Sequence, residues 1–594
     1  MTEPTLAYYT PLDPIKREIR LITLKSLAHI RSQQLPDETI CCEFIRTSLF
    51  DPINYTALSY AWEDLSNKQN VNIEGHVQGV SSNLAAALRT LRDEHSDTML
   101  WADQLCIHQL NDAEKSHQVG MMKDIYERAM SVTVWLGPTA DDSDMIVATL
   151  KEVSKYSEET LEDSASILSD IVQGLKQQVG TACSDQQPYN TDTILARLQT
   201  AFECFCRRSY WKRLWVIQEF AIAQVLNLVC GSANITFHDF CTAWWLLSRL
   251  RDHAKRYPNS PRDSMDILAI AKQCWSVADS FASGIITRRQ KTRLQLSKGE
   301  KTEGLFSTMS ANLILETDYN QPLTSDPRDR VFSLLGLAGD RDKFGHFPDY
   351  SKTVEEVYEQ LALDFLRQGH IDNFAHCQSP RLLSKLPTWV PDWSMPIQSP
   401  VIGHPLLSWF TAGGNQLPSQ CVVAFESGRI TLRGYYVERI QSLGSYWDPN
   451  WLEVVNFHDL ALYLSSIEEF CRKSPRIRPE DIEIDCARIA MGDRVNFRIK
   501  SESTDDFLRQ SYRIVAKWAA QGIESSNSNS SDVEQQSLPA DRAARAYIGV
   551  LLRLHSRRTF ISHTGYIGLA PTGALENDVI CIFPGGRGYT YFVL

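Results

Sequence analysis

A regular alternation of strand-like and helix-like segments between residues 55 and 136 is the feature that most restricts how this chain folds. Short apolar runs at residues 55–60, 99–107 and 132–136 are typical of buried strands. Two amphipathic segments lie between these runs. Because strand–helix–strand units with short connections bring their strands side by side and parallel, the pattern predicts a parallel sheet covered by helices.

Capping residues mark where the two predicted helices begin. Residues 81–83 (Ser-Ser-Asn) precede the first helix, and Asn111 with Asp112 precedes the second. The apolar faces consist of Leu84, Leu88 and Leu91 in the first helix and of Val119, Met122, Tyr126 and Ala129 in the second. These spacings of three and four residues indicate helices that each bury one side.

Changes in pattern along the chain predict four segments. Residues 1–54 hold short strands that lead into an α/β domain at residues 55–235, which carries a helical insertion at about 140–200. Residues 236–400 are mainly helical. Residues 401–594 are strand-rich and contain a Ser/Asn/Gln-rich run at about 523–540 that we expect to be disordered. The expected fold class is therefore α/β with flanking helices, then a helical region, then a strand-rich α+β part.

The composition of the 594 residues excludes several classes of protein. Apolar residues make up 43% of the chain, enough for several packed cores, so disorder is not its dominant state. A net formal charge of −12 argues against a nucleic-acid-binding surface over the whole molecule. The 14 cysteines form no regular framework, and we find neither a signal peptide nor an 18-residue apolar run. We expect a soluble, cytoplasmic protein with reduced thiols.

One basic stretch contrasts with the acidic balance. Such a run is typical of a nuclear-localisation or phosphate-binding patch, or of a solvated loop, and we favour the loop. Because the run has no interleaved aromatic residues, we expect no nucleic-acid binding. Its members are Arg288, Arg289, Lys291, Arg293, Lys298 and Lys301.

The common catalytic and metal-binding motifs are absent. The sequence has no phosphate-binding loop, dinucleotide fingerprint, HExxH, GxSxG or paired CxxC motif. Cys41 and Cys42 are adjacent, and Cys204 and Cys206 are separated by one residue; neither spacing is typical of zinc. We therefore expect no bound metal and no cofactor.

Cys106 and His108 lie two residues apart at the end of a predicted strand, where their side chains share a face. A thiolate–imidazole pair is one interpretation. A packed cysteine beside a loop histidine is the other, and we favour it because no third group is evident that would orient the histidine.

Polar residues at the carboxyl ends of the predicted strands are better candidates for a site. Ligands bind beyond these ends in open α/β sheets. Capping and loop hydrogen bonds explain the same residues equally well. The candidates are Trp62, Glu63 and Asp64 after the first strand, and Asp103, His108 and Gln109 at the end of the second.

Glu219 lies in an otherwise apolar helix expected at residues 210–224. A carboxylate in such a helix should be buried, and a buried carboxylate needs a partner or a function. An ion pair with Arg213 is the structural explanation, and a role in ligand chemistry is the functional one.

Four motifs that follow one another along the chain resemble the heterokaryon incompatibility (HET) domain of filamentous fungi. The family pattern is roughly ALSYxWG, LWIDxxCINQ, ERxxQVxxMxxIYxxAxxVxVWLG and RxWFxRVWVxQE, in this order. Glu63 and His108 depart from the family's usual Gly and Asn, which argues against His108 as a shared catalytic residue. The matching stretches of this chain are residues 55–62, 100–109, 114–137 and 208–219. The resemblance continues beyond the domain, because similar fungal proteins also carry counterparts of residues 326–337, 348–351, 389–394 and 565–571.

HET domains are thought to be distantly similar to TIR domains, flavodoxin-like parallel sheets that act in innate immunity and cell death. Leu58-Ser59-Tyr60 resembles the TIR "SY" strand, and Trp215 with Glu219 resembles the TIR "WCxxE" motif, whose Glu is catalytic in NAD-cleaving members. The match is partial, because Val216 replaces the Cys and Arg213 stands where TIR domains have Ser.

The TIR resemblance implies a set of site residues and a substrate. Glu219 would be catalytic, hydrogen-bonding the nicotinamide ribose of NAD and stabilising an oxocarbenium-like transition state before water completes the hydrolysis. NAD would then be a substrate and not a cofactor. Taken together with the strand-end candidates, the expected ligand-binding residues are Tyr60, Trp62, Asp103, Gln109 and Trp215.

Three functional hypotheses follow from the sequence. The first is a signalling effector of fungal allorecognition and programmed cell death. The second is a TIR-like NAD glycohydrolase that uses Glu219, and the third is a non-catalytic interaction scaffold. The expected partners are proteins, either further copies of this chain or other incompatibility proteins, with no membrane span.

Overall fold

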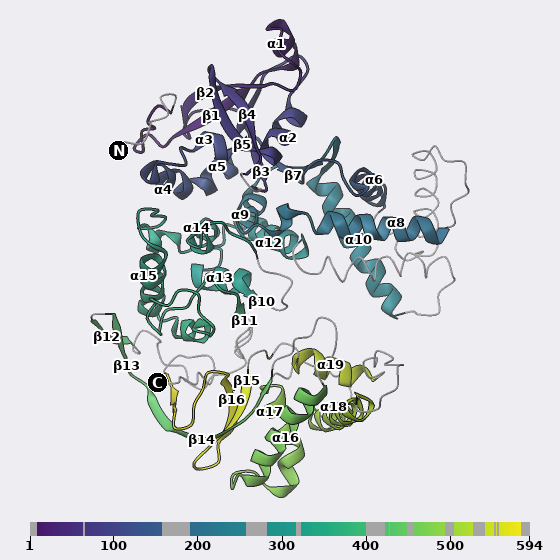
Figure 1. Cartoon of the computed structure of the whole chain (residues 1–594), viewed down its shortest axis with the longest axis vertical. Helices are drawn as coiled ribbons and strands as arrows, with labels where there is room; N and C mark the ends of the chain where they lie inside the picture. The colour runs from purple at the N-terminus through teal and green to yellow at the C-terminus, as the bar shows by residue number, and fades with distance from the viewer. Residues whose placement is uncertain are drawn as a thin grey trace. The chain divides into compact units, whose positions relative to one another are not determined.

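The computed structural model describes residues 9–62, 66–156, 191–256, 282–315, 322–398, 422–426, 428–447, 457–493, 504–526, 541–551, 554 and 557–583. Figure 1 shows the helices and strands along the chain. Two compact units form: Met1–Thr308 with Tyr319–Lys352, and Met309–Asp318 with Thr353–Leu594. The finer four-segment division stays a prediction.

A mixed sheet forms the centre of the first unit, with the strand order β5-β4-β2-β1-β6-β3-β7-β8-β9. Its strands are β1 (Glu18–Leu24), β2 (Ile40–Ser48), β3 (Thr56–Tyr60), β4 (Lys68–Ile73), β5 (His76–Ser81), β6 (Thr98–Trp101), β7 (Ser131–Trp135), β8 (Leu226–Cys230) and β9 (Ala233–Thr236). The predicted α/β class is confirmed.

The four neighbouring strands β6, β3, β7 and β8 are parallel. Numbered by their order along the chain, they have the spatial order 2-1-3-4, which is how the flavodoxin-type order 2-1-3-4-5 begins. Strand β1 is antiparallel to both β2 and β6, so the N-terminal strands extend the same sheet. The sheet is therefore mixed, with a parallel centre.

Helices cover both faces of this parallel centre. Trp135 of β7 donates from Nε1 to Asn83 of α2 (Ser82–Leu91) at 2.8 Å, whereas the Ser59 hydroxyl of β3 donates to Glu219 of α9 (Trp215–Ile222). Tyr60 and Trp135 are register partners, so their side chains point to the same face of the sheet. Ser59 precedes Tyr60 and points to the other face, so α2 and α9 pack on opposite faces. The helices of the first unit are α1 (Leu27–Ser32), α2 (Ser82–Leu91), α3 (Asp103–Cys106), α4 (Asp112–Gly120), α5 (Met122–Arg128), α6 (Ser143–Val153), α8 (Thr191–Cys206), η2 (Ser209–Lys212), α9 (Trp215–Ile222), α10 (Phe237–Arg256), α12 (Ala282–Ser297), α13 (Leu305–Leu313, which continues into the second unit), α14 (Asp329–Leu335) and η3 (Arg341–Phe344).

The predicted caps are confirmed, but two segments differ from the prediction. Ser81 accepts from the Leu84 amide, and Asn111 accepts from the Glu114 amide. The helix expected after Asn111 is divided into α4 and α5, with the break after Gly120, a residue type of low helix propensity. The strand expected at residues 99–107 ends at Trp101, because the next residues form the short helix α3.

The structure of the basic stretch also differs from the prediction. Most of it forms α12 and not a solvated loop, and Arg289 is 5% exposed. Its guanidinium donates to the backbone oxygens of Phe220 and Ala223 at 2.7 and 2.6 Å, which are end carbonyls of α9. Burial lowers the pKa of Arg289 to about 10. This arginine therefore caps a helix that carries the candidate site.

The second unit combines an antiparallel sheet, β16-β15-β14-β17, with four helices that share one apolar core, which agrees with the predicted α+β part. Within the predicted disordered run, residues 523–526 belong to α18 and residues 527–540 lie outside the described part. The elements of this unit are β10 (Ile314–Leu315), α15 (Val354–Arg367), η4 (Ile371–His376), β11 (Ile397–Gln398), β12 (Val422–Glu426), β13 (Arg429–Leu432), β14 (Tyr435–Trp447), α16 (Phe457–Lys473), η6 (Pro479–Asp481), α17 (Ile482–Ala490), α18 (Thr504–Ser526), α19 (Arg542–Leu551), β15 (Arg557–Ser562), β16 (Ile567–Pro571) and β17 (Val579–Ile582).

Candidate functional site

The carboxyl end of β3 gathers most of the candidate residues. Tyr60 is the last residue of this strand, and Trp62 follows it. Asp103 comes directly after the neighbouring strand β6, and α9 brings Glu219 to the face of Ser59. This is the edge of an α/β sheet at which ligands bind.

Asp103 is held by Trp62 on one side of this edge. The Trp62 indole Nε1 donates to both carboxylate oxygens of Asp103, at 3.0 and 2.9 Å. The Gln104 amide also donates to Asp103, at 2.8 Å, and Gln109 donates from its side chain to the Asp103 backbone oxygen at 2.9 Å. Burial raises the pKa of Asp103, although the Arg213 charge and the hydrogen bonds from Trp62 and Gln104 oppose the shift.

Glu219 is buried on the other side, where the residue is 2% exposed. The Ser59 hydroxyl donates to Glu219 Oε2 at 2.5 Å and lies 3.0 Å from the Tyr210 hydroxyl. Burial raises the pKa of Glu219 to about 7; the Arg213 charge lowers it, and the Asp103 charge raises it. Glu219 therefore changes its protonation state near neutral pH.

Arg213 is a cation whose charge lowers the pKa of both carboxyl groups. It is an extended residue between η2 and α9, so the helix expected at residues 210–224 is interrupted there. Its guanidinium donates to the Tyr60 backbone oxygen and sits 5.8 Å from the centre of the Trp62 ring. In the described residues it forms no ion pair with Glu219, which differs from the structural explanation suggested by the sequence.

The carboxyl groups of Glu219 and Asp103 lie on opposite faces of the sheet. Successive side chains of a strand point to opposite sides, so Ser59 reaches Glu219 while Tyr60 lies on the face of Asp103. Burial, together with the Asp103 charge, raises the pKa of the Tyr60 hydroxyl. The residues therefore flank the end of β3, with Arg213 as the cation that both carboxyl groups share.

Other predicted residues lie elsewhere or have other contacts. Trp215 donates from Nε1 to Asp329 at 3.0 Å and not toward Glu219. His108 stacks on Tyr9 with ring centres 4.7 Å apart, and Cys106 is buried with its pKa raised to about 12. In the described residues no contact joins Cys106 to His108, and burial disfavours a thiolate. Glu63 and Asp64 lie outside the described residues.

Ser59, Tyr210 and Tyr126 were missed by the sequence analysis as neighbours of Glu219. Ser59 had one signal, because it is a polar residue inside an apolar strand. Tyr126 donates to the Leu58 backbone oxygen at 3.1 Å, and burial together with the Glu219 charge raises its pKa. Aromatic residues at apolar positions give no sequence signal that separates this role from core packing.

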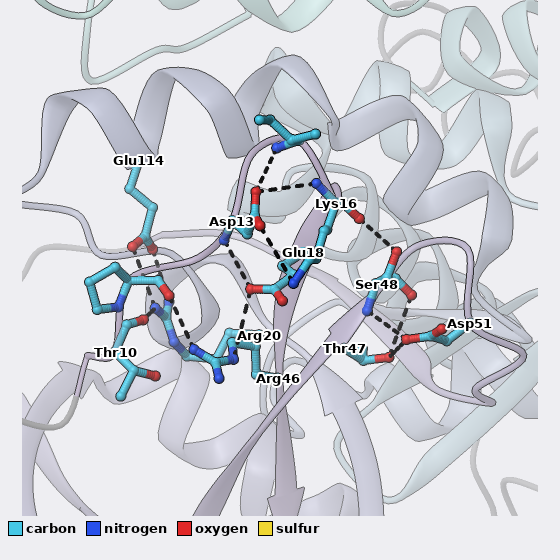
Figure 2. Close-up of polar contacts among 12 residues, drawn as sticks. Thr10, Asp13, Lys16, Glu18, Arg20, Arg46, Thr47, Ser48, Asp51 and Glu114 are labelled. Atoms are coloured by element: carbon cyan, nitrogen blue, oxygen red, sulfur yellow. Dashed lines mark hydrogen bonds and ion pairs between the residues drawn. The ribbon is translucent and has the colours of Figure 1, made fainter.

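A buried ion pair fixes the loop that follows the site (Figure 2). Arg20 of β1 donates to Glu114 at 2.9 Å, to the Thr10 backbone oxygen at 2.8 Å and to the Cys106 backbone oxygen at 2.8 Å. The side chains of Arg20 and Glu114 are 2% and 9% exposed. Glu114 also accepts from the His108 amide at 2.9 Å. The chain between α3 and α4 is thereby tied to β1.

The described part of the chain holds neither a metal-binding cluster nor a membrane-spanning helix. No group of three or more His, Cys, Asp or Glu side chains is arranged to hold a metal ion there. Within the same residues, none of the helices has the length and apolar character needed to cross a bilayer.

Comparison with known proteins agrees with the motif pattern. The family model described as "Heterokaryon incompatibility protein (HET)" matches residues 55–219, from the residue before β3 to Glu219 itself. The chain is also similar to "Heterokaryon incompatibility protein 6, OR allele" of Neurospora crassa, with 25% identity over 618 aligned residues that cover 92% of this chain and 87% of the relative. No solved structure matches. Residues 55–219 thus match the HET domain, and nearly the whole chain is similar to a heterokaryon incompatibility protein.

Proposed function

We propose that this protein is an effector of fungal allorecognition, and that its HET domain triggers programmed cell death when the protein is activated. The observation that carries this proposal is the joint match of the domain and of nearly the whole chain to an incompatibility protein. We further propose that it acts in the cytoplasm through protein partners, either further copies of itself or other incompatibility proteins.

Induced expression of the full chain in a filamentous fungus tests the effector function. We expect growth arrest and uptake of a vital dye by hyphal cells. Leu58→Asp serves as the inactive control, because a carboxylate at this buried position disrupts the central sheet. Normal growth and viability with confirmed accumulation of the full chain would contradict the proposal.

A second candidate function is hydrolysis of the N-glycosidic bond of NAD. The observation that favours it is Glu219, a carboxyl group with a pKa of about 7 beside the carboxyl end of a parallel strand. A protonatable carboxyl group can stabilise an oxocarbenium-like transition state once it is ionised. Because Glu219 is 2% exposed, this candidate requires that substrate entry uncovers it.

Nicotinamide release by the purified full chain, measured at high protein concentration, tests the second candidate. We expect release by the original protein, loss of release in Glu219→Gln, and unchanged release in the control Glu127→Gln on α5. Equal rates in Glu219→Gln and the original protein exclude Glu219 as the catalytic residue. If neither cell death nor nicotinamide release occurs but a stable protein complex is recovered, the chain is an interaction scaffold.

A further inference from the structure

The HET family match ends at Glu219, but the compact unit that contains it continues to Lys352. Residues beyond the matched region contact the segment that carries Glu219. The Leu323 amide donates to the Lys212 backbone oxygen at 2.5 Å, and the Leu214 amide donates back to Leu323 at 3.2 Å. These bonds form a parallel bridge that brackets Arg213. The later segment thus pairs with the chain next to the candidate site.

Asp329 makes the next contact along α9. Its carboxylate accepts from Trp215 Nε1 at 3.0 Å on one oxygen and from the Tyr350 hydroxyl at 2.5 Å on the other. Burial raises the pKa of Asp329, while these two hydrogen bonds oppose the shift. Trp215 is the first residue of α9, so Asp329 holds the start of the helix that carries Glu219.

Tyr350 connects the same contact to another helix of the HET domain. Its backbone amide donates to the Ser116 hydroxyl of α4 at 2.8 Å, and the Lys115 ammonium lies 4.0 Å from the centre of its ring. Asp329 and Tyr350 together therefore bridge α4 and α9, which are far apart in sequence.

Gln218 supplies a further contact directly before Glu219. Its side-chain oxygen accepts from the Gly336 amide at 3.0 Å. A Cβ atom at position 336 would lie 2.3 Å from that oxygen, so a larger residue there would displace the Gln218 side chain. Contacts from residues 323, 329 and 336 thus follow the chain from Arg213 to Gln218.

We propose that residues 322–352 are an integral part of the HET effector module and that Asp329 is a positioning residue, which holds α9 and thereby sets Arg213 and Glu219 against the end of β3. The claim that Asp329 positions α9 does not depend on the proposed function. The claim that this positioning is needed for cell death rests on the proposed function.

Hydrogen exchange of the full chain tests the structural part. In Asp329→Asn, one of the two buried donors faces an amide N–H₂ group in place of an oxygen, so we expect amides of α9 to exchange at least tenfold faster. Tyr350→Phe keeps the Trp215 contact and should give a smaller increase. The control is Asp349→Asn, whose carboxylate accepts from Ser351 and has no contact with α9.

The location of the change separates positioning from general stability. Faster exchange confined to residues 213–222, with β3 and β7 still protected, supports the proposal. Unchanged exchange in α9, or an equal increase across the whole sheet, overturns it. Cell death is then measured for the same variants: if the original protein kills, Asp329→Asn should not, and normal killing by this variant would also overturn the inference. If the original protein does not kill, the proposed function fails while the exchange result stands.

Discussion

Two buried glutamates of the first unit differ in one respect that decides their behaviour. Glu114 forms a direct ion pair with the buried Arg20, whereas Glu219 accepts from Ser59 and has no ion-pair partner in the described residues. A buried guanidinium needs a counter-charge, which Glu114 supplies to Arg20. Burial without such a pair raises the pKa of Glu219 to about 7. The first arrangement stabilises a loop, and the second leaves a group that titrates at physiological pH.

The same substitution at the two positions should have opposite effects. Glu114→Gln removes the charge but leaves Arg20 buried without a counter-ion, so we expect a loss of about 3–5 kcal/mol in the free energy of unfolding. Urea denaturation followed by tryptophan fluorescence measures it. Exchange of amides at residues 106–108 should also increase, since Glu114 accepts from His108. A loss below about 1 kcal/mol would show that the pair is not a structural anchor.

Glu219→Gln should stabilise the protein at alkaline pH. Because the pKa of Glu219 is raised in the folded state, its contribution to stability is complete below the pKa of the unfolded chain and is lost as pH rises through about 7. Glutamine keeps an acceptor for Ser59 and never ionises. We expect equal stability near pH 4 and a gain of up to about 3 kcal/mol for the variant at pH 9. Parallel pH profiles for the two proteins would contradict the raised pKa.

Trp62→Phe tests the other carboxyl group of the site. The change removes the indole N–H that Asp103 accepts on both oxygens, while most of the aromatic packing remains. We expect a loss of about 1–2 kcal/mol at pH 7. Trp245→Phe is the control, because that residue is 38% exposed and distant in sequence. If both changes lower the free energy of unfolding equally, the Trp62–Asp103 hydrogen bonds make no specific contribution to stability.

Arg46→Ala should have the smallest effect. Arg46 lies near Arg20 in Figure 2, but its side chain is 52% exposed and its contact with Glu18 is 3.8 Å long. Exposed ion pairs of this kind contribute roughly 0–1 kcal/mol. A denaturation midpoint within error of the original protein is expected, and a loss comparable to that of Glu114→Gln would remove the distinction between buried and exposed pairs.

Local sequence patterns predicted much of the α/β domain. The strands near Tyr60 and Trp135 and the caps at Ser81 and Asn111 are confirmed, since apolar spacing and capping act within a few residues. The pattern failed at residues 102–107, where an apolar run continues past the strand into α3. It also failed at Arg289, whose buried position depends on the end of α9, more than sixty residues away.

The candidate site was predicted in part. The strand-end argument predicted that Trp62, after β3, and Asp103, after β6, lie close together. The hydrogen bond between their side chains agrees with this prediction. Trp215 was grouped with Glu219 by a motif spacing, but its indole is directed to Asp329, a residue more than a hundred positions later. Whether these residues bind a ligand stays a prediction.

The sequence by itself determined the alternation of strands and helices, the helix starts and the resemblance to the HET family. These depend on short-range spacing, which a linear pattern retains. Only the tertiary structure decided which buried carboxylate is paired, that Glu219 titrates near neutral pH, and that residues 322–352 pack on α9. The reason is that burial and long-range hydrogen bonds set the cost of a charge, and both arise from segments that meet only in the fold.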